Sequence, residues 1–475
     1  MVDSAGIRLT TGEIARMTGA ELVEVREGTE YLGVSTDSRT IQSGEIFVAL
    51  HGDTFDGHDY LEDVKKKGAR AVLINRTRIE SLPGGIGAFV VDDTLFALGE
   101  LARRHRERIS ARVVGITGSN GKTTTKELVY DVVSRRFSAE KSRGNFNNLI
   151  GLPMMLLSMD ERCEVIVVEL GMNTPGEMKR LVSIAGPDIG VITNIGPVHL
   201  EGVGSIEGVY REKREMFLAL PKDGAAICEA DGAFSEDLRR DAAARCITFG
   251  FGIDADVRAE NIDERGDGTT RADFIVPGGS FNAVFHIPGR HNLKNALAAL
   301  AVGSALGMDV DDMKGAVEES RPVSMRMELA ETKNGVVVLN DSYNANPVSM
   351  KAALEYLALE SRRRKGRLLA ALGDMLELGD YARQEHEQVG GVAAREGYEK
   401  LFILGDHSSD VARGATSEGM EKSEIRIYEK NAQQSLIDEL MREVRPGDCV
   451  MIKGSRGMRM EQVACALLDL DTAQL

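Results

Sequence analysis

The feature that most constrains the fold of this chain is an apolar run that leads, through two glycines, directly into a segment of helix-forming character. The run Val113–Thr117 is short and rich in β-branched residues, which predicts a buried strand. Gly118 and Gly121 make the turn, and Lys122 and Thr123 follow it. Strand, glycine turn and helix in this order are typical of an α/β sheet that binds a ligand at the carboxyl ends of its strands.

The glycine turn has the chemistry of a phosphate-binding loop. Glycines allow backbone N–H groups to approach phosphate oxygens, and the start of the next helix adds positive potential. A lysine then reaches the β- and γ-phosphates of a nucleotide, and a threonine hydroxyl binds magnesium. The strict GxxxxGK[ST] spacing is not met, because Ile116 stands where its first glycine is expected. We predict an ATP-binding loop, rather than a turn with a solvated lysine, formed by Gly118, Ser119, Asn120, Gly121, Lys122, Thr123 and Thr124.

Alternating apolar and helical segments divide the 475 residues into three parts. A single hydrophobic core stops growing at roughly 250–300 residues, so more than one domain is expected. Apolar strands at 164–170 and 189–195 predict a parallel, doubly wound sheet, and residues from about 224 to 288 predict an appended β-rich lobe. The expected fold class is α/β with three domains: a smaller α/β domain at 1–109, a central P-loop domain with a mainly parallel sheet at 110–322, and a Rossmann-like domain at 323–475.

Charge and apolar patterning argue against two classes of partner. The chain has 58 Lys and Arg against 74 Asp and Glu, and its formal charge of −16 repels a nucleic-acid backbone. We expect no signal peptide and no membrane span, because the first residues lack a basic and apolar leader and no apolar run reaches about 18 residues.

The five cysteines are widely spaced without a CxxC pair, which predicts a reducing cytoplasmic location. A monomer is the expected oligomeric state.

Five residues of the middle part are candidate site residues, and the patterns of four of them leave two interpretations open. Glu169 ends an apolar strand, where a carboxylate either binds magnesium or caps the strand. His199 follows another strand end and is either a second metal ligand or a structural histidine. Lys213 has the pattern of an ordinary surface lysine. Asn292 and Asn295, on an alanine-rich helix, are either a cap and a surface amide or contacts to a purine edge.

The third part adds an arginine and a polar turn. Arg326 precedes a predicted strand, at a domain boundary where an arginine is commonly a solvated charge. The turn NDSYNANP, residues 340–347, includes Asp341, Tyr343 and Asn344 and gathers hydrogen-bonding side chains after a strand, although turns also use Asn and Asp for backbone reasons. Several strands of this part end in Asp or Gly, which indicates a second ligand-contacting domain.

Taken in order, the segments TGSNGKTTT, GNFNNLIGLP, VVELGMN, TNIGPVHLEG, EKREMF, GRHNLKNALAA, RMELA and NDSYNANP resemble the Mur ligase family. The first domain joins this resemblance through residues 34–73, and the third through ALGDMLELG at 371–379. These segments are most similar to the members that join D-alanyl-D-alanine to UDP-N-acetylmuramoyl-tripeptide. The DNPR-type motif of the diaminopimelate-adding members is absent from the sequence, which disfavours that alternative.

The resemblance implies roles for individual residues in the ATP site. Lys122 matches the ATP-phosphate lysine and Arg326 the γ-phosphate arginine, while Asp341, followed by Tyr343 and Asn344, matches a ribose-contacting carboxylate. Asn292 and Asn295 match adenine-proximal amides. The implied metal site holds two Mg²⁺ ions on Thr123, Glu169, His199 and Lys213, with Lys213 carbamylated.

The resemblance also implies the substrate contacts and the reaction. Ser35, Asp37, Ser38 and Arg39 resemble the segment that faces the uridine nucleotide, and Asn145, Asn147 and Asn148 resemble the loop that faces the muramoyl-peptide. ATP would phosphorylate the tripeptide carboxylate, and the dipeptide amine would displace phosphate to form an amide. Closure of the domains would assemble the site and exclude water.

Two alternatives stay open, as does the identity of the third peptide residue, lysine or diaminopimelate. Another amino-acid-adding or folylpolyglutamate-type ligase would share the ATP chemistry, although the STDSR segment argues against folate. A P-loop switch or motor would share Lys122 and Thr123 but not the asparagine-rich loops or the third domain.

Overall fold

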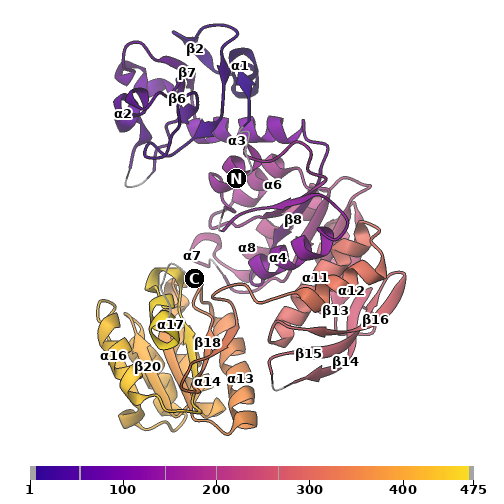
Figure 1. The fold of residues 1–475 in the computed structure, drawn as a ribbon, viewed down its shortest axis with the longest axis vertical. Helices are drawn as coiled ribbons and strands as arrows, with labels where there is room; N and C mark the ends of the chain where they lie inside the picture. Colours follow the sequence, from indigo (N-terminus) through magenta and orange to yellow (C-terminus); the bar gives the residue numbers. More distant parts are fainter. Residues whose placement is uncertain (1–6, 53–54, 145, 199, 266, 470–475) are drawn as a thin grey trace.

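Three sheet-based units follow one another along the chain in the structure, which is a computed structural model and describes residues 7–52, 55–144, 146–198, 200–265 and 267–469. The first unit lies at one end of an elongated molecule, the central unit in the middle and the third unit at the opposite end (Figure 1). The α/β fold class is confirmed, since each unit combines helices with a largely parallel sheet. None of the helices formed by the described residues is long and apolar enough to span a membrane.

The first unit is built on a five-stranded sheet with a small two-stranded sheet beside it. Its strands follow the order β2 (Glu21–Val23), β7 (Gly87–Val91), β6 (Ala71–Asn75), β5 (Ile46–Val48) and β4 (Val34–Ser35), with only β2 antiparallel to its neighbour. The small sheet pairs β1 (Leu9–Thr10) with β3 (Glu30–Tyr31), and the helices are α1 (Thr11–Thr18), α2 (Leu61–Lys66) and α3 (Thr94–Arg106). Helix α3 packs on α5 and α6, so one hydrophobic core continues into the central unit.

The central unit is a nine-stranded sheet covered by helices on both faces. Its strands follow the order β16 (Gly279–Phe285), β15 (Thr270–Val276), β14 (Val257–Glu264), β13 (Arg245–Gly250), β12 (Ala225–Glu229), β11 (Ile189–Ile192), β8 (Arg112–Thr117), β10 (Val165–Glu169) and β9 (Ala139–Lys141). One face carries α4 (Lys122–Val133), α11 (Arg290–Ala305) and α12 (Val310–Glu319). The other helices are α5 (Gly151–Leu156), α6 (Glu177–Ala185), α7 (Leu200–Val203), α8 (Ile206–Lys213), α9 (Glu215–Leu218) and α10 (Ser235–Asp241).

The segment expected to form an appended β-rich lobe instead extends this sheet. Strands β14, β15 and β16 pair antiparallel with one another, and β14 joins the parallel part through β13. Alternate side chains, among them Phe274, Phe281 and Phe285, enter the core under α11 and α12. Burial of this apolar face against existing helices explains why the strands continue the sheet rather than form a separate layer.

The third unit is a six-stranded sheet in which only the edge strand β17 is antiparallel. The order is β17 (Glu328–Glu331), β18 (Val337–Asn340), β22 (Cys449–Lys453), β19 (Leu368–Gly373), β20 (Lys400–Leu404) and β21 (Ile425–Tyr428). Helices α13 (Pro347–Arg364), α14 (Ala382–Glu396) and α15 (Ser408–Ser417) cover one face, and α16 (Gln433–Glu443) and α17 (Glu461–Leu468) cover the other. The carboxyl ends of β18 and β22 therefore present their loops at one edge.

Candidate active site

The predicted phosphate-binding loop lies between β8 and α4, and its two glycines are sterically required. Gly118 has φ +150°, and a Cβ there would lie 1.9 Å from Oγ1 of Thr193. Gly121 has φ +80° at the N-cap of α4, and a Cβ there would lie 2.5 Å from Oδ1 of Asn295. Both positions combine a left-handed backbone with close packing, which only glycine tolerates. The loop therefore packs closely against Thr193, directly after β11, and against Asn295 of α11.

The loop after β11 is hydrogen-bonded to the phosphate-binding loop. The amide of Asn120 donates to Oδ1 of Asn194 at 2.9 Å, and Oγ1 of Thr193 donates to the Asn120 carbonyl at 2.5 Å. The hydroxyl of Ser119 donates to the Gly196 carbonyl at 2.9 Å and accepts from the Gly196 amide at 2.8 Å. The sequence analysis singled out the segment TNIGPVHLEG for its order among the motifs and for His199, but it did not select Thr193 and Asn194, whose signal was a Thr-Asn pair directly after a buried strand.

Lys122 folds back over the loop that precedes it. Its Nζ donates to the Gly118 carbonyl at 2.8 Å and lies 3.4 Å from the Ser119 carbonyl. Burial lowers the pKa of Lys122, and the carboxylate of Glu169 opposes that shift. The ammonium group is thus held beside the backbone groups that form the loop. Thr124, also predicted to contact nucleotide, is buried in the first turn of α4.

Thr123 and Glu169 meet where the loop and the end of β10 come together. Oγ1 of Thr123 donates to Oε2 of Glu169 at 2.8 Å, and Nδ2 of Asn147 donates to Oε1 at 2.9 Å. Hydroxyl and carboxylate oxygens are the ligands that Mg²⁺ prefers, so this pair fits a magnesium site. His199 and Asn145 lie outside the described residues. Among the described residues, no three His, Cys, Asp or Glu side chains gather closely enough to hold a metal alone.

Lys213 is buried at the end of α8, which contradicts the surface position that its pattern alone suggested. Within the described part of the chain, its Nζ forms a hydrogen bond only to Oγ1 of Thr117, at 3.5 Å. Burial, reinforced by the positive charge of Lys122, holds the pKa of Lys213 well below its usual range. The ammonium group of Lys213 therefore loses its proton more easily than that of an exposed lysine.

Asn292 and Asn295 form a buried pair in the first turns of α11. Nδ2 of Asn292 donates to the Pro288 carbonyl at 2.7 Å, and Nδ2 of Asn295 donates to Oδ1 of Asn292 at 3.1 Å. Asn295 also packs against Gly121 of the phosphate loop. The N-cap of α11 is Gly289 and neither amide lies on the surface, so the interpretation as a cap and a surface amide is wrong.

The third unit reaches the loop through two side chains. Nη2 of Arg326 donates to Oγ1 of Thr123 at 2.9 Å, and Nδ2 of Asn346 donates to Oδ1 of Asn120. The Nε–H of Arg326 is buried without a hydrogen-bond partner among the described residues. Its guanidinium therefore keeps a donor available at the loop and is not a solvated boundary charge.

Asp341 is an anchor inside the third unit as well as a candidate ligand contact. Its Oδ1 accepts from the Met327 amide at 3.1 Å, and its Oδ2 forms a buried ion pair with Lys453. Nζ of Lys453 also donates to the Asn344 carbonyl at 2.9 Å, which ties the turn 340–347 to the end of β22. Sequence reasoning did not select Lys453, although a lysine that ends a wholly apolar strand was an available signal.

The predicted substrate residues of the first unit lie elsewhere. Asp37 forms a close ion pair with Arg39, which lowers the pKa of Asp37 to about 2, and Oγ of Ser35 donates to the Asp37 carbonyl at 3.2 Å. Ser38 is buried, and its carbonyl accepts from Lys67. This unit stands at the end of the molecule opposite to the third unit (Figure 1). In the central unit, Asn148 holds the start of α5 by accepting from the Gly151 amide at 2.8 Å.

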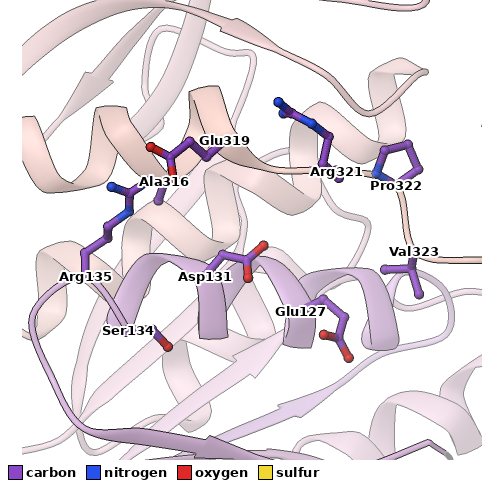
Figure 2. A pocket seen from close by; sticks show the side chains of 9 residues that line it. All are labelled: Glu127, Asp131, Ser134, Arg135, Ala316, Glu319, Arg321, Pro322 and Val323. Atoms are coloured by element: carbon purple, nitrogen blue, oxygen red, sulfur yellow. Dashed lines mark ion pairs between the residues drawn. The ribbon is translucent and has the colours of Figure 1, made fainter.

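Two cavities differ in which residues line them. The larger, about 480 Å³, lies between α4 and the segment after α12, and Figure 2 shows Asp131 of α4 across from Arg321. None of the predicted site residues lines it. The smaller, about 200 Å³, has Ser119 and Lys122 on one wall and the third-unit loops 344–346, 376–378 and 455–457 on the other. Since only the smaller cavity adjoins the phosphate loop, it is the candidate active site.

Family models and relatives agree with this geometry. The Mur ligase family catalytic domain matches residues 30–116, the Mur ligase middle domain matches 116–303, and the Mur ligase glutamate ligase domain matches 325–456. The UDP-N-acetylmuramoyl-tripeptide–D-alanyl-D-alanine ligase of Bacillus subtilis is 36% identical over 98% of this chain and 99% of its own.

Solved structures extend the similarity to three dimensions. A crystal structure of MurF from Acinetobacter baumannii has a TM-score of 0.88 at 30% identity, covering 98% of this chain and 100% of that one. MurF ligase from Thermotoga maritima, solved in complex with ADP, has a TM-score of 0.80 at 28% identity, covering 92% and 97%. From the phosphate loop to these whole-length matches, the observations agree: the chain belongs to the Mur ligase family.

Proposed function

We propose that the protein is the ATP-dependent ligase that joins D-alanyl-D-alanine to UDP-N-acetylmuramoyl-tripeptide, which supplies the pentapeptide precursor of peptidoglycan. The observation that carries the proposal is the meeting of Arg326 from the third unit with Thr123 of the phosphate loop. This contact sets the arginine beside Lys122 and the Glu169 carboxylate. The name of the Bacillus subtilis relative and the ADP bound to the Thermotoga maritima ligase support this substrate set.

The residues of the loop suit transfer of a phosphoryl group to a carboxylate. The bond between the γ-phosphorus and the β–γ bridging oxygen breaks, a bond forms to a tripeptide carboxylate oxygen, and ADP leaves. Lys122, the loop amides and the Nε–H of Arg326, which has no hydrogen-bond partner among the described residues, would offset the charge on the phosphoryl oxygens. The dipeptide amine then attacks the acyl carbon, loses a proton and expels phosphate, which leaves an amide.

This reaction needs no protein nucleophile, and the cysteines are poorly suited to be one. Burial raises the pKa of Cys228 to about 12 and that of Cys163 to about 11, so neither thiol forms its reactive thiolate at neutral pH. All five cysteines are free, which supports a cytoplasmic setting for the enzyme.

Thr123 and Glu169 would hold Mg²⁺, with His199 and Lys213 as further members of the proposed two-ion site. When bound, magnesium supplies positive charge to the phosphate oxygens and helps to orient them. Lys213 supports the proposal of a carbamate, because a neutral buried amine can add to CO₂ and lose a proton. The resulting anion would replace a neutral amine and would be stabilised by the positive charge of Lys122.

The three units divide the substrates in our proposal. Residues 1–109 bind the uridine nucleotide, 110–322 bind ATP, and 323–475 contact ATP and the dipeptide. The cavity of about 200 Å³ would receive the dipeptide, because it lies between the phosphate loop and the loops of the third unit. No partner beyond these substrates is required for a site formed within one chain, in keeping with a monomer.

The test is phosphate release by the purified protein with ATP and Mg²⁺, given the tripeptide substrate and D-alanyl-D-alanine separately and together. Release only with both, and a product mass equal to the pentapeptide, is the expected result. Turnover with a different amine would keep the mechanism and change the substrate. Release without either substrate would favour a P-loop switch or motor instead.

A further inference from the structure

The arginine that enters the phosphate loop is carried by an unusually conformed segment. Met325 has φ +60° and Met327 has φ +49°, so both neighbours of Arg326 are non-glycine residues in the left-handed region. Such a residue is strained and persists only where surrounding contacts enforce its backbone conformation. The contacts that enforce this conformation therefore decide where the guanidinium points.

An aromatic side chain supplies the first of these contacts. The guanidinium carbon of Arg326 lies 4.0 Å from the ring centroid of Tyr343, within cation–π range. The amide of Tyr343 also donates to the Met325 carbonyl at 3.2 Å. Tyr343 thus holds both the side chain of Arg326 and the backbone just before it.

The buried ion pair supplies the second contact. Oδ1 of Asp341 accepts from the Met327 amide at 3.1 Å, directly after Arg326, while its other oxygen pairs with Lys453. Lys453 is almost wholly buried and also donates to the Asn344 carbonyl, so it fixes the same turn from β22. Both oxygens of Asp341 are therefore engaged within the third unit.

We propose that Tyr343 and the Asp341–Lys453 pair are positioning residues, which aim the Arg326 guanidinium at the γ-phosphate side of the loop. This differs from a direct contact of Asp341 and Tyr343 with the nucleotide. The inference rests on the proposed function only for its kinetic readout. These three residues act through Arg326, so the effects of replacing them must disappear when Arg326 is absent.

A double-mutant cycle between Tyr343 and Arg326 tests the inference. Tyr343→Leu removes the ring at similar bulk, Tyr343→Phe keeps it, and Arg326→Ala removes the guanidinium. We expect Tyr343→Leu to lower kcat roughly tenfold, the size of a partly desolvated cation–π contact, and Tyr343→Phe to stay close to wild type. In the Arg326→Ala background, Tyr343→Leu should have no further effect. The inference would be overturned if the two substitutions lowered kcat by factors that multiply in the double variant. It would also be overturned if Tyr343→Leu raised the KM for ATP and left kcat unchanged.

A second readout separates this inference from the proposed function. Calorimetry gives the affinities of the same variants for ATP and for ADP, without either ligase substrate. Arg326→Ala and Tyr343→Leu should each lower the preference for ATP over ADP, and the double variant should lower it no more than Arg326→Ala alone. An unchanged ATP preference in Tyr343→Leu would refute the positioning role, even if the wild type proved to use another amine.

The ion pair is tested with Asp341→Asn, which keeps an oxygen for the Met327 amide but removes the charge facing Lys453. We expect Asp341→Asn to lower kcat when Arg326 is present and to cause no further loss of kcat in the Arg326→Ala variant. Thermal unfolding of the full chain shows whether the variant folds, and the Tyr343 cycle decides the proposal if it does not. An equal loss in both backgrounds would mean that Asp341 acts on the nucleotide itself.

Discussion

Two lysines of the site, Lys122 and Lys213, show how one residue type takes different roles through its surroundings. Lys122 is hydrogen-bonded to the carbonyls of its own loop, and the carboxylate of Glu169 opposes the lowering of its pKa by burial. Lys213 is fully buried against a threonine hydroxyl and is pushed toward the neutral form. The first arrangement favours charge stabilisation, and the second favours covalent modification by CO₂.

Replacing Lys122 by Ala removes the ammonium group that we propose to face the transferred phosphoryl oxygens. We expect phosphate release to fall by at least about 100-fold, the usual cost of deleting one preorganised charge stabiliser. The measurement is phosphate release with both substrates present. Lys179→Ala, at an exposed lysine of α6, is the control and should stay near wild type. Near-normal turnover by Lys122→Ala would disprove the role of the loop.

Replacing Lys213 by Ala removes the amine that we expect to carry a carbamate. Activity should fall by about 10- to 100-fold or more, as for loss of a metal-orienting group. Added acetate or formate should restore part of it, because a small carboxylate can enter the space left by the side chain. Turnover is measured against carboxylate concentration, with Lys122→Ala as a variant that carboxylates should not rescue. Wild-type turnover in Lys213→Ala would exclude the carbamate.

At the scale of elements, the site depends on how the turn between β8 and α4 fits its neighbours. The turn is closed by the loop after β11 and by α11, which come from distant parts of the chain. Its conformation was predictable from local sequence, because glycines at its left-handed positions are a local requirement. The segments that support the turn were not predictable from local sequence, because strand order and helix packing bring them to the turn.

Gly118→Ala tests this dependence on close packing. The added Cβ would meet Thr193 at a backbone conformation that alanine rarely adopts, so we expect the free energy of unfolding to fall by about 1–3 kcal/mol. ATP affinity should fall as well, since the loop amides would be displaced. Denaturant unfolding and nucleotide titration measure the two effects. Gly84→Ala, which meets nothing within 4 Å, is the matched control and should change neither.

At the scale of the whole molecule, the central and third units share one site. The contacts Arg326–Thr123 and Asn346–Asn120 join them at the phosphate loop. Away from the loop, Arg363 of α13 donates to the Glu264 carbonyl of β14 at 2.9 Å. Catalysis in such an arrangement depends on how well two separately folded sheets are held together. Changes in that relation should alter kinetics without unfolding either unit.

Asn346→Ser isolates the contact between units. Oδ1 of Asn346 caps α13 by accepting from the Ser349 amide at 3.0 Å, and Nδ2 of the same side chain donates to Asn120. Serine is an equally good cap but is too short to reach Asn120, so stability should change by less than about 0.5 kcal/mol. We expect KM for ATP to rise severalfold. Asn346→Ala, which loses the cap as well, should be less stable by about 1 kcal/mol. Unchanged kinetics in Asn346→Ser would show that this contact does not couple the units.

By itself the sequence determined the α/β class, the phosphate loop and the order of motifs that identifies the family. These properties are local, because apolar periodicity and glycine turns act within a few residues along the chain. Only the tertiary structure decided that Lys213 is buried, that Arg326 reaches Thr123 from the next unit, and that Lys453 holds Asp341. Each of these depends on which distant segments pack together. Burial and partner charge are consequences of that packing, and spacing along the chain does not encode them locally.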